Sequence, residues 1–266
     1  MKRGYFTTLM AILGFVFLYA PIVSLVVFSF NESRLVTVWT GFSLRWYASL
    51  FGDSQVVAAG LLSLQIAAVS ATIATILGTL AGIALTRLGK FRGKTALTGM
   101  VSAPLVMPEV ITGLSALLLF VSMEAIIGWP GGRGFTTITI AHSTFCMAYV
   151  TVVVRSRLVD MDRSLDEAAM DLGATPLRVF FDITLPIIAP ALISGWLLAF
   201  TLSLDDLVIA SFVSGPGSST LPMVIFSKIR LGVSPDVNAL ATIIIAIVAI
   251  GVIAATIIGA RRQPNA

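Results

Sequence analysis

Two long apolar runs without a single charge decide what this chain can fold into. Thr8–Phe30 is a run of 23 residues and Val56–Thr86 a run of 31, and neither contains Asp, Glu, Lys or Arg. About 20 consecutive apolar residues are enough for a helix to cross the hydrocarbon core of a bilayer. Only 11% of the 266 residues are charged, against about 25% in a typical soluble domain. The sequence therefore predicts an integral membrane protein.

Four further apolar stretches bring the predicted number of membrane spans to six. Each span must satisfy its backbone hydrogen bonds internally, so the predicted fold is all-α, a single transmembrane domain over residues 1–266. The predicted spans are residues 8–30, 56–86, 95–123, 135–154, 187–212 and 237–260. We expect the first span to be retained, because its apolar run is too long for a signal peptide and Phe28–Asn31 offers no cleavage site of small residues.

The distribution of basic residues predicts the orientation of these spans. With the N-terminus in the cytoplasm, twelve Lys and Arg residues fall inside and five outside, and basic residues concentrate on the cytoplasmic side of membrane proteins. Both termini are therefore predicted to be cytoplasmic. The inside set is Lys2, Arg3, Arg87, Lys90, Arg92, Lys94, Arg155, Arg157, Arg163, Arg178, Arg261 and Arg262. The outside set is Arg34, Arg45, Arg133, Lys228 and Arg230.

Composition excludes most enzyme classes. A single cysteine, Cys146, and a single histidine, His142, cannot build a disulfide or a metal site made of several such residues, and both are predicted to be packing residues. The basic residues are scattered, so nucleic acid is not an expected partner. Gly89–Thr95 resembles a phosphate-binding loop, but it has three residues between its glycines where four are needed. The chain is predicted to be no enzyme and to bind no metal, cofactor or nucleotide itself.

The longest predicted cytoplasmic loop, residues 155–186, contains signals for two short helices. Ser164 and Glu167 form a predicted capping box that opens a helix at Leu165. Gly173 stands where a helix needs a left-handed terminator, and Thr175 followed by a proline suits the start of a second helix. From these residues alone, an amphipathic helix pair lying on the membrane surface is as good an interpretation as a docking surface for another protein.

The spacing within this loop favours the docking surface. It reads Glu167-Ala168-Ala169, three residues, Gly173, nine residues, and then Ile183-x-Leu185-Pro186. This pattern resembles the cytoplasmic motif of permease subunits in binding-protein-dependent ABC importers. The resemblance implies the type I importer permease fold. It also implies that Glu167, Ala168, Ala169 and Gly173 form the surface that couples to a separate ATPase. The residues Ile183, Leu185 and Pro186 would then lead the chain back into the membrane.

Three carboxylates fall within the predicted spans. Glu109 follows two prolines that would kink the third span, and Asp205 and Asp206 are neighbours in the fifth. Carboxylates inside a membrane are costly and commonly mark a transport pathway. No predicted span contains Lys or Arg, so we expect their partner to come from another subunit, water, a proton or a cationic substrate. The alternative is that they lie near the outer interface and cap helices.

Longer segments carry a second resemblance, which covers almost the whole chain. Phe42–Tyr47, Ala103–Gly113 and Ser203–Gly217 are similar to segments of the polyamine branch of these permeases, and within it to putrescine permeases. The resemblance implies a bacterial inner-membrane protein. Its partners would be a second related permease in a heterodimer, two copies of a cytoplasmic ATPase that uses ATP, and a periplasmic polyamine-binding protein.

The predicted function is the import of putrescine by alternating access, driven by ATP hydrolysis on the partner subunit. Glu109, Asp205 and Asp206 are the candidate residues of the substrate path. Spermidine or another cationic solute is the alternative substrate. A self-contained secondary transporter or channel that uses the same carboxylates is the alternative from a different class.

Overall fold

The computed structural model describes residues 2–35, 38–232 and 234–261, and almost all of them are helical. The elements before the predicted loop are α1 (Lys2–Phe28), α2 (Arg45–Gly52), α3 (Ser54–Arg87), α4 (Lys94–Val106), α5 (Glu109–Ile127) and α6 (Phe135–Asp160). The loop holds α7 (Ser164–Asp171), α8 (Pro176–Val179) and a π-helix, η1 (Phe180–Thr184). The remaining elements are α9 (Leu185–Asp205), α10 (Val208–Val213), α11 (Leu221–Leu231) and α12 (Pro235–Arg261).

Five helical segments within the described residues are long and apolar enough to cross a membrane. They are Gly4–Phe28, Ser54–Arg87, Glu109–Ile127, Phe135–Asp160 and Pro176–Asp205. The stretch Pro235–Ile250 of α12 is apolar but shorter. The side chains of Lys2, Arg3 and Arg261, the residue Arg262 and the side chains of α12 after residue 250 lie outside the described residues.

Two predicted spans are each divided into two helices. The third, residues 95–123, is α4 followed by α5, with the extended residues Met107 and Pro108 between them. The fifth, residues 187–212, is α9 followed by α10, with extended backbone at Asp206. Proline explains the first interruption, because it lacks the N–H that a continuous helix needs. The second interruption has no proline and depends on side-chain contacts described below.

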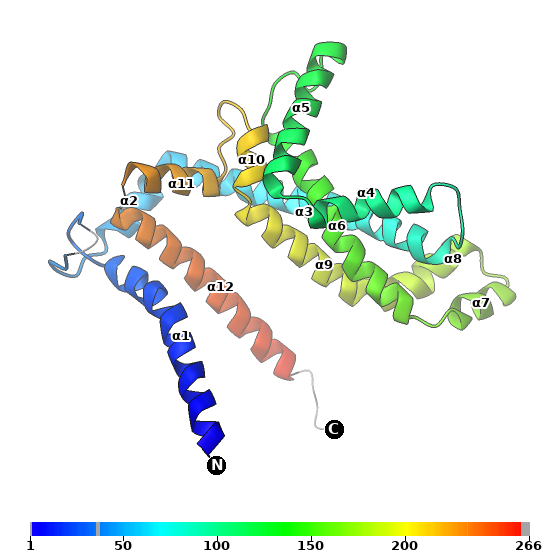
Figure 1. Ribbon diagram of the computed structural model, residues 1–266, viewed down its shortest axis with the longest axis horizontal. Coiled ribbons are helices and arrows are strands. Elements are labelled where there is room, and N and C mark those ends of the chain that lie inside the picture. The colour runs from blue at the N-terminus through cyan, green and yellow to red at the C-terminus, as the bar shows by residue number, and fades with distance from the viewer. Residues whose placement is uncertain (1, 36–37, 233, 262–266) are drawn as a thin grey trace. The chain divides into compact units, whose positions relative to one another are not determined.

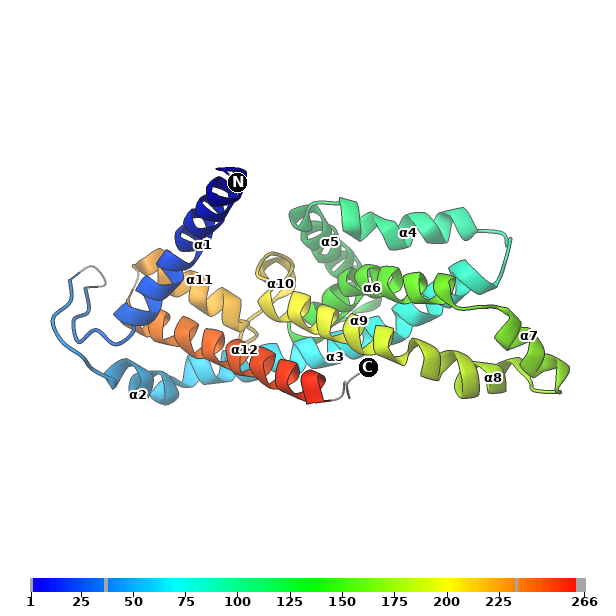
Figure 2. The same cartoon turned by 90° about the horizontal axis from the view of Figure 1, so that it is seen from below.

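The chain divides into two compact units, and residues 59–223 form the larger one. Its centre is α6, which packs along α9 and also contacts α4 and α10 (Figures 1 and 2). Small residues make this close packing possible. Cys146 is fully buried and its Sγ lies 3.5 Å from the carbonyl oxygen of Ala199, so the prediction that Cys146 is a packing residue is confirmed.

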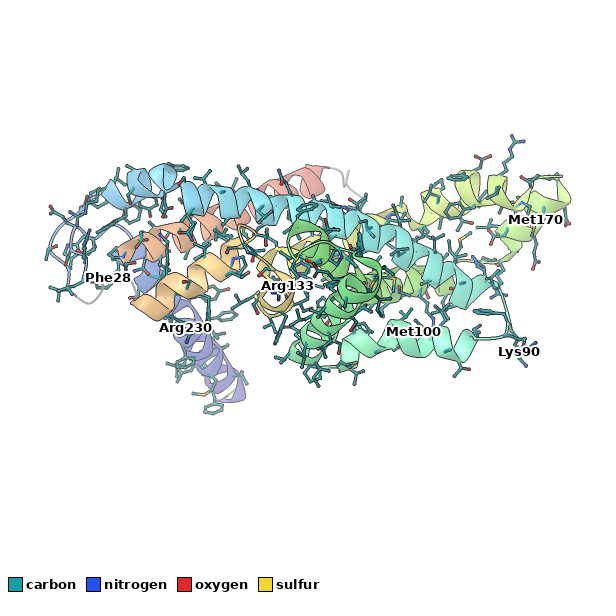
Figure 3. The ribbon with its side chains drawn as sticks, turned by 90° about the horizontal axis from the view of Figure 1, so that it is seen from above. Phe28, Lys90, Met100, Arg133, Met170 and Arg230 are labelled. Atoms are coloured by element: carbon teal, nitrogen blue, oxygen red, sulfur yellow. The ribbon has the colours of Figure 1, made fainter. Side chains whose placement is uncertain are left out.

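Glycine permits an equally close contact between α3 and α6. A Cβ atom placed at Gly78 would lie 2.9 Å from the Cβ of Val150 and 3.1 Å from the carbonyl oxygen of Met147. Such distances are shorter than packed side chains tolerate. Within this unit, α7 and α8 lie at one end of the helices and α5 and α10 at the other (Figures 1 and 2). Figure 3 likewise shows Lys90 and Met170 at one end and Arg133 toward the other.

The smaller unit comprises residues 1–58 and 224–266, in which α12 packs against α1 and α2. Asn31 organises the connection between α1 and α2: its Nδ2 donates to the carbonyl oxygens of Leu35 and Val38, and its own carbonyl oxygen accepts from Trp46 Nε1 at 2.7 Å. Lys228 is held by two carboxylates, with Nζ 2.8 Å from Asp53 Oδ2 and 3.1 Å from Asp236 Oδ2.

Candidate functional site

The bend predicted within residues 155–186 is present. Gly173 has a φ of 88°, the left-handed conformation that glycine adopts without a steric penalty. The N–H of Ala174 donates to the carbonyl oxygen of Ala169 at 3.0 Å, and the N–H of Gly173 donates to that of Met170 at 2.9 Å. This pair of hydrogen bonds is the Schellman arrangement that ends many helices. The prediction that Gly173 terminates the first short helix is confirmed.

The start of that helix differs from the prediction. α7 begins at Ser164 itself, and the N–H of Ser164 donates to Asp162 Oδ1 at 2.9 Å. No side chain caps the helix from the preceding Arg163. The predicted capping box of Ser164 and Glu167 is therefore wrong, because Ser164 is itself the first helical residue and the Asp162 carboxylate accepts its N–H. The same hydrogen bond lowers the pKa of the Asp162 carboxyl.

The second short helix begins as predicted. Thr175 is extended, its Oγ1 accepts from the N–H of Arg178 at 3.4 Å, and Pro176 occupies the first helical position. The chain then continues through η1 into α9 without leaving a helical conformation. Of the residues predicted to lead back into the membrane, Ile183 and Leu185 are half-buried and Pro186 is exposed.

The predicted coupling residues lie on an accessible surface. Glu167, Ala168 and Gly173 are exposed, and Ala169 is half-buried. Around them lies a patch of exposed large apolar side chains that the sequence reasoning missed. The patch consists of Leu165, Met170, Leu172, Leu177 and Phe181. Leu172, in the bend itself, is 90% exposed. Leu165, Met170 and Leu172 lie outside the segments long enough to cross a membrane, and apolar residues so exposed there indicate a surface that another protein covers. Their presence in a predicted loop was the available signal.

The three predicted carboxylates all lie at the two helix interruptions. Glu109 is the first residue of α5, Asp205 is the last residue of α9, and Asp206 forms the extended link to α10. The side chains of Glu109 and Asp205 are exposed, whereas Asp206 is buried. The ends of α4 and α9 leave backbone carbonyl groups without helical partners, and a helix C-terminus carries partial negative charge. The carbonyl groups at these two helix ends, together with the exposed carboxylates of Glu109 and Asp205, can accept hydrogen bonds from a cation.

Packing between α5 and α10 brings the two interruptions together. A Cβ atom at Gly113 would lie 3.2 Å from the Cα of Ile209 and 2.7 Å from Cδ2 of Phe212, so the helices touch at this glycine. Glu109 precedes Gly113 by about one helical turn, and Asp205 precedes Ile209 by the same interval along the chain. The glycine thus allows the beginnings of α5 and α10, which follow the two interruptions, to lie in contact.

Asp206 has a partner within this chain, contrary to the prediction. Its Oδ1 lies 3.2 Å from His142 Nε2 of α6, and the two side chains are 4% and 1% exposed. His142 Nδ1 in turn lies 2.8 Å from Ser203 Oγ. Asp206 Oδ1 also accepts the N–H of Ala210 at 2.8 Å and so caps α10. His142, predicted to be a packing residue, is thus also a polar partner of Asp206.

Comparison with known proteins shows the family to which the chain belongs. Residues 74–264 match the family model described as a binding-protein-dependent transport system inner membrane component. The chain is 62% identical to the putrescine transport system permease protein PotI of Escherichia coli (strain K12), covering 93% of this chain and 88% of that protein. It is 44% identical to the spermidine/putrescine transport system permease protein PotC of Haemophilus influenzae, covering 92% and 93%.

Solved structures share the fold at low sequence identity. A chain of a bacterial ABC transporter involved in the import of the acidic polysaccharide alginate has a TM-score of 0.75 and 17% identity, and the match covers 99% of this chain and 98% of that one. A chain of the MetNI methionine ABC transporter, in an inward-facing conformation, has a TM-score of 0.62 and also 17% identity, over 78% and 96%. These matches show that the chain shares the fold of these transporter chains.

Proposed function

Because this chain belongs to the family of binding-protein-dependent transport system inner membrane components, we propose that it is the permease subunit of an ATP-driven importer that carries putrescine across the bacterial inner membrane. The observation that carries the proposal is the 62% identity to a putrescine permease over 93% of the chain. Spermidine is the second candidate substrate, because spermidine/putrescine permeases are 41% to 44% identical over nearly the same length.

The proposed architecture has six spans with both termini in the cytoplasm. In the part of the chain that the structure describes, five helical segments have the required length and apolar composition, and in this proposal α12 supplies the sixth span. The partners are a second related permease, two copies of a cytoplasmic ATPase and a periplasmic polyamine-binding protein. An alginate importer of the same fold has been solved in complex with its periplasmic protein, which supports the last of these.

The proposed substrate path runs past the two helix interruptions. A diamine carries two positive charges at neutral pH, and moving them out of water is costly unless carboxylates or carbonyl groups replace the lost hydration. Asp205 and Glu109 have exposed carboxylates available for this role, and the free carbonyl groups at the ends of α4 and α9 add to them. Asp206 is buried against His142 and caps α10, so its proposed role is to stabilise the break between α9 and α10.

The proposed coupling surface is α7 with the bend that follows it. Glu167, Ala168, Ala169 and Gly173 are the predicted contact residues, and the apolar patch around Leu172 supplies the area that a partner would bury. The residues Ile183, Leu185 and Pro186 carry the connection into α9. In this proposal the ATPase binds and hydrolyses ATP, and the permease binds neither nucleotide nor any other cofactor.

Uptake of radiolabelled putrescine tests this function. Cells that lack this gene and all other putrescine uptake routes are compared with cells in which the gene is restored, with and without excess unlabelled spermidine. Restored uptake that spermidine barely inhibits supports putrescine as the substrate. Strong inhibition by spermidine instead favours the second candidate. Equal uptake in both strains contradicts the proposal. Uptake by this chain without the ATPase would favour a self-contained transporter or channel.

A further inference from the structure

We propose that Arg87, Asp166 and Thr184 form a tie that passes movement of α7 to α3 and α9 together. The inference rests on the proposed function, in which the ATPase acts on α7. Asp166 lies in the first turn of α7 and uses both of its carboxylate oxygens. Oδ2 lies 3.3 Å from Nη2 of Arg87, the last residue of α3, and Oδ1 accepts from Thr184 Oγ1, at the end of η1, at 3.3 Å.

A second contact strengthens the connection to α3. Arg163, just before α7, donates from Nη2 to the carbonyl oxygen of Thr86 at 2.7 Å. That carbonyl belongs to the last turn of α3, where helix carbonyl groups have no partner of their own. The short helix is therefore held to the end of α3 by both its leading residue and its first turn.

Burial distinguishes this ion pair from an ordinary surface pair. The side chains of Arg87 and Asp166 are 15% and 18% exposed, so water and salt screen their attraction only partly. The same segment contains a contrasting pair, Arg178 and Asp182, one helical turn apart, with side chains 75% and 60% exposed. Pairs so exposed contribute little to stability. The chain thus offers a matched control within 20 residues of the tie.

A cleft of about 380 Å³ surrounds the tie. Its lining includes Ile83, Arg87, Asp166, Glu167 and Val179. Space of this size leaves α7 room to shift relative to α3. The polar contacts across this cleft therefore fix the position of α7 relative to α3. Among the described residues, Nε and Nη2 of Arg87 make no hydrogen bond. Arg87 therefore retains donors for a closer approach of Asp166 when α7 moves.

The tie connects the coupling surface to the candidate substrate site through one helix, α9. Thr184 directly precedes α9, whose 21 residues extend over about 30 Å and end at Asp205. Pulling on Asp166 therefore displaces the beginning of the helix whose other end carries a candidate substrate carboxylate. Arg87 applies the same displacement to α3, which packs against α6. Asp166 is thus a positioning residue for coupling.

Transport and ATP hydrolysis measured together test the tie. The complete importer is reconstituted in proteoliposomes with its loaded binding protein, and the putrescine transported per ATP hydrolysed is recorded. We expect Asp166→Ala and Arg87→Ala to retain the ATPase in the purified complex but to lower this ratio about fivefold or more. The double variant Arg178→Ala/Asp182→Ala is the matched control and should keep the wild-type ratio. The exchanged pair Arg87→Asp/Asp166→Arg should recover part of the loss.

An unchanged ratio in both single variants overturns the tie. If Asp166→Ala does not assemble, Thr184→Val decides the matter, because it removes one hydroxyl contact while keeping the side chain's shape. We expect Thr184→Val to lower the ratio and to stay assembled, and a wild-type ratio would contradict the proposal. Failure of the proposed function gives a different result: the wild-type importer then carries no putrescine, or Glu167→Lys leaves ATPase binding and uptake intact.

Discussion

At the scale of single residues, Asp205 and Asp206 are neighbours in the chain with opposite surroundings. Asp206 is buried against His142 and caps α10, whereas Asp205 is exposed and makes no ion pair among the described residues. The side chain of Asp206 is only 4% exposed, so it is less accessible to a moving substrate than that of Asp205. In the proposed function, Asp206 therefore stabilises the break between α9 and α10, and Asp205 contacts the cationic substrate.

Replacing His142 should cost stability. The change His142→Ala removes the imidazole that lies 3.2 Å from the buried Asp206 carboxylate and that hydrogen-bonds Ser203, and loss of such buried polar contacts costs about 1–3 kcal/mol. We expect a lower midpoint in thermal melting of the detergent-solubilised importer. The double variant His142→Ala/Asp206→Ala should lose less than the sum of the two single changes, because the residues interact. Cys146→Ala, one turn along the same helix, serves as a control. Wild-type melting of His142→Ala would show that the contact contributes nothing.

Replacing Asp205 should affect transport and leave stability intact. The change Asp205→Asn keeps the size of an exposed side chain and removes its charge. A hydrogen bond to a charged group is worth about 1.5–3 kcal/mol, so we expect initial putrescine uptake at low concentration to fall about tenfold or more, with unchanged melting. Glu124→Gln is the matched control, an exposed carboxylate near the other end of α5. Normal uptake by Asp205→Asn would remove Asp205 from the substrate path.

At the scale of helices, the position of the site depends on how closely α5 approaches α10. The change Gly113→Ala places a methyl group 3.2 Å from the Cα of Ile209, and backbone yields less readily than a side chain. Overpacking of this kind costs about 1–3 kcal/mol, and here it separates the two helix interruptions. We expect reduced uptake together with a lower melting midpoint. Gly99→Ala in α4 meets nothing within 4 Å and should change neither. If Gly113→Ala transports normally, the site does not need this contact.

The ion-pair cluster of Asp53, Lys228 and Asp236 allows a prediction about how stability depends on pH. Partial burial lowers the pKa of Lys228, but hydrogen bonds to the two carboxylates outweigh it and the pKa is raised above 10.5. The hydrogen bond from Lys228 lowers the pKa of Asp53 below 3.8. Lys228 therefore contributes its full share to the stability of the folded protein at any pH below its pKa in the unfolded chain, and this share is lost as the pH rises through its pKa in the folded protein. Asp53 contributes its full share at any pH above its pKa in the unfolded chain, and this share is lost as the pH falls through its pKa in the folded protein.

The loss of stability caused by Lys228→Met, relative to the wild type, should consequently be constant between about pH 5 and pH 9. The side chains involved are 21% to 30% exposed, so we expect a deficit of only about 1 kcal/mol. Thermal melting of the wild type and the variant across this range provides the check. A deficit that changes with pH inside the range would mean that another titrating group controls this contact. Arg230→Met, on the same helix, is the control.

Local signals in the sequence predicted single elements well and their mutual contacts poorly. Gly173 and Thr175 act as predicted, because caps and bends depend on neighbouring residues. The break after α9 could not be predicted, since no proline marks it and it rests on Asp206 meeting His142, 64 residues away along the chain. Pairing of α6 with α9 creates that contact, and apolar periodicity does not specify which helices pair. The tie at Asp166 escaped prediction for the same reason.

At the scale of the whole molecule, the number of spans determines the side on which each end of the chain lies. Five segments within the described residues are long enough to cross, and α12 decides between five and six. Six crossings place both termini on the same side, and five place them on opposite sides. The ATPase needs the connection through α7 to be cytoplasmic, so the number of crossings also decides whether the termini lie on the side of the coupling surface.

Cysteine labelling distinguishes these arrangements. The only native cysteine, Cys146, is fully buried, so Cys146→Ala provides a background without reactive thiols. In that background we expect Arg34→Cys, Arg133→Cys and Arg230→Cys to react in intact cells with a membrane-impermeant maleimide. Lys90→Cys and a cysteine added after Ala266 should react only once the inner membrane is opened. Labelling of the added C-terminal cysteine in intact cells would mean that α12 does not cross, while labelling of Lys90→Cys would reverse the orientation and place α7 beyond the reach of any ATPase.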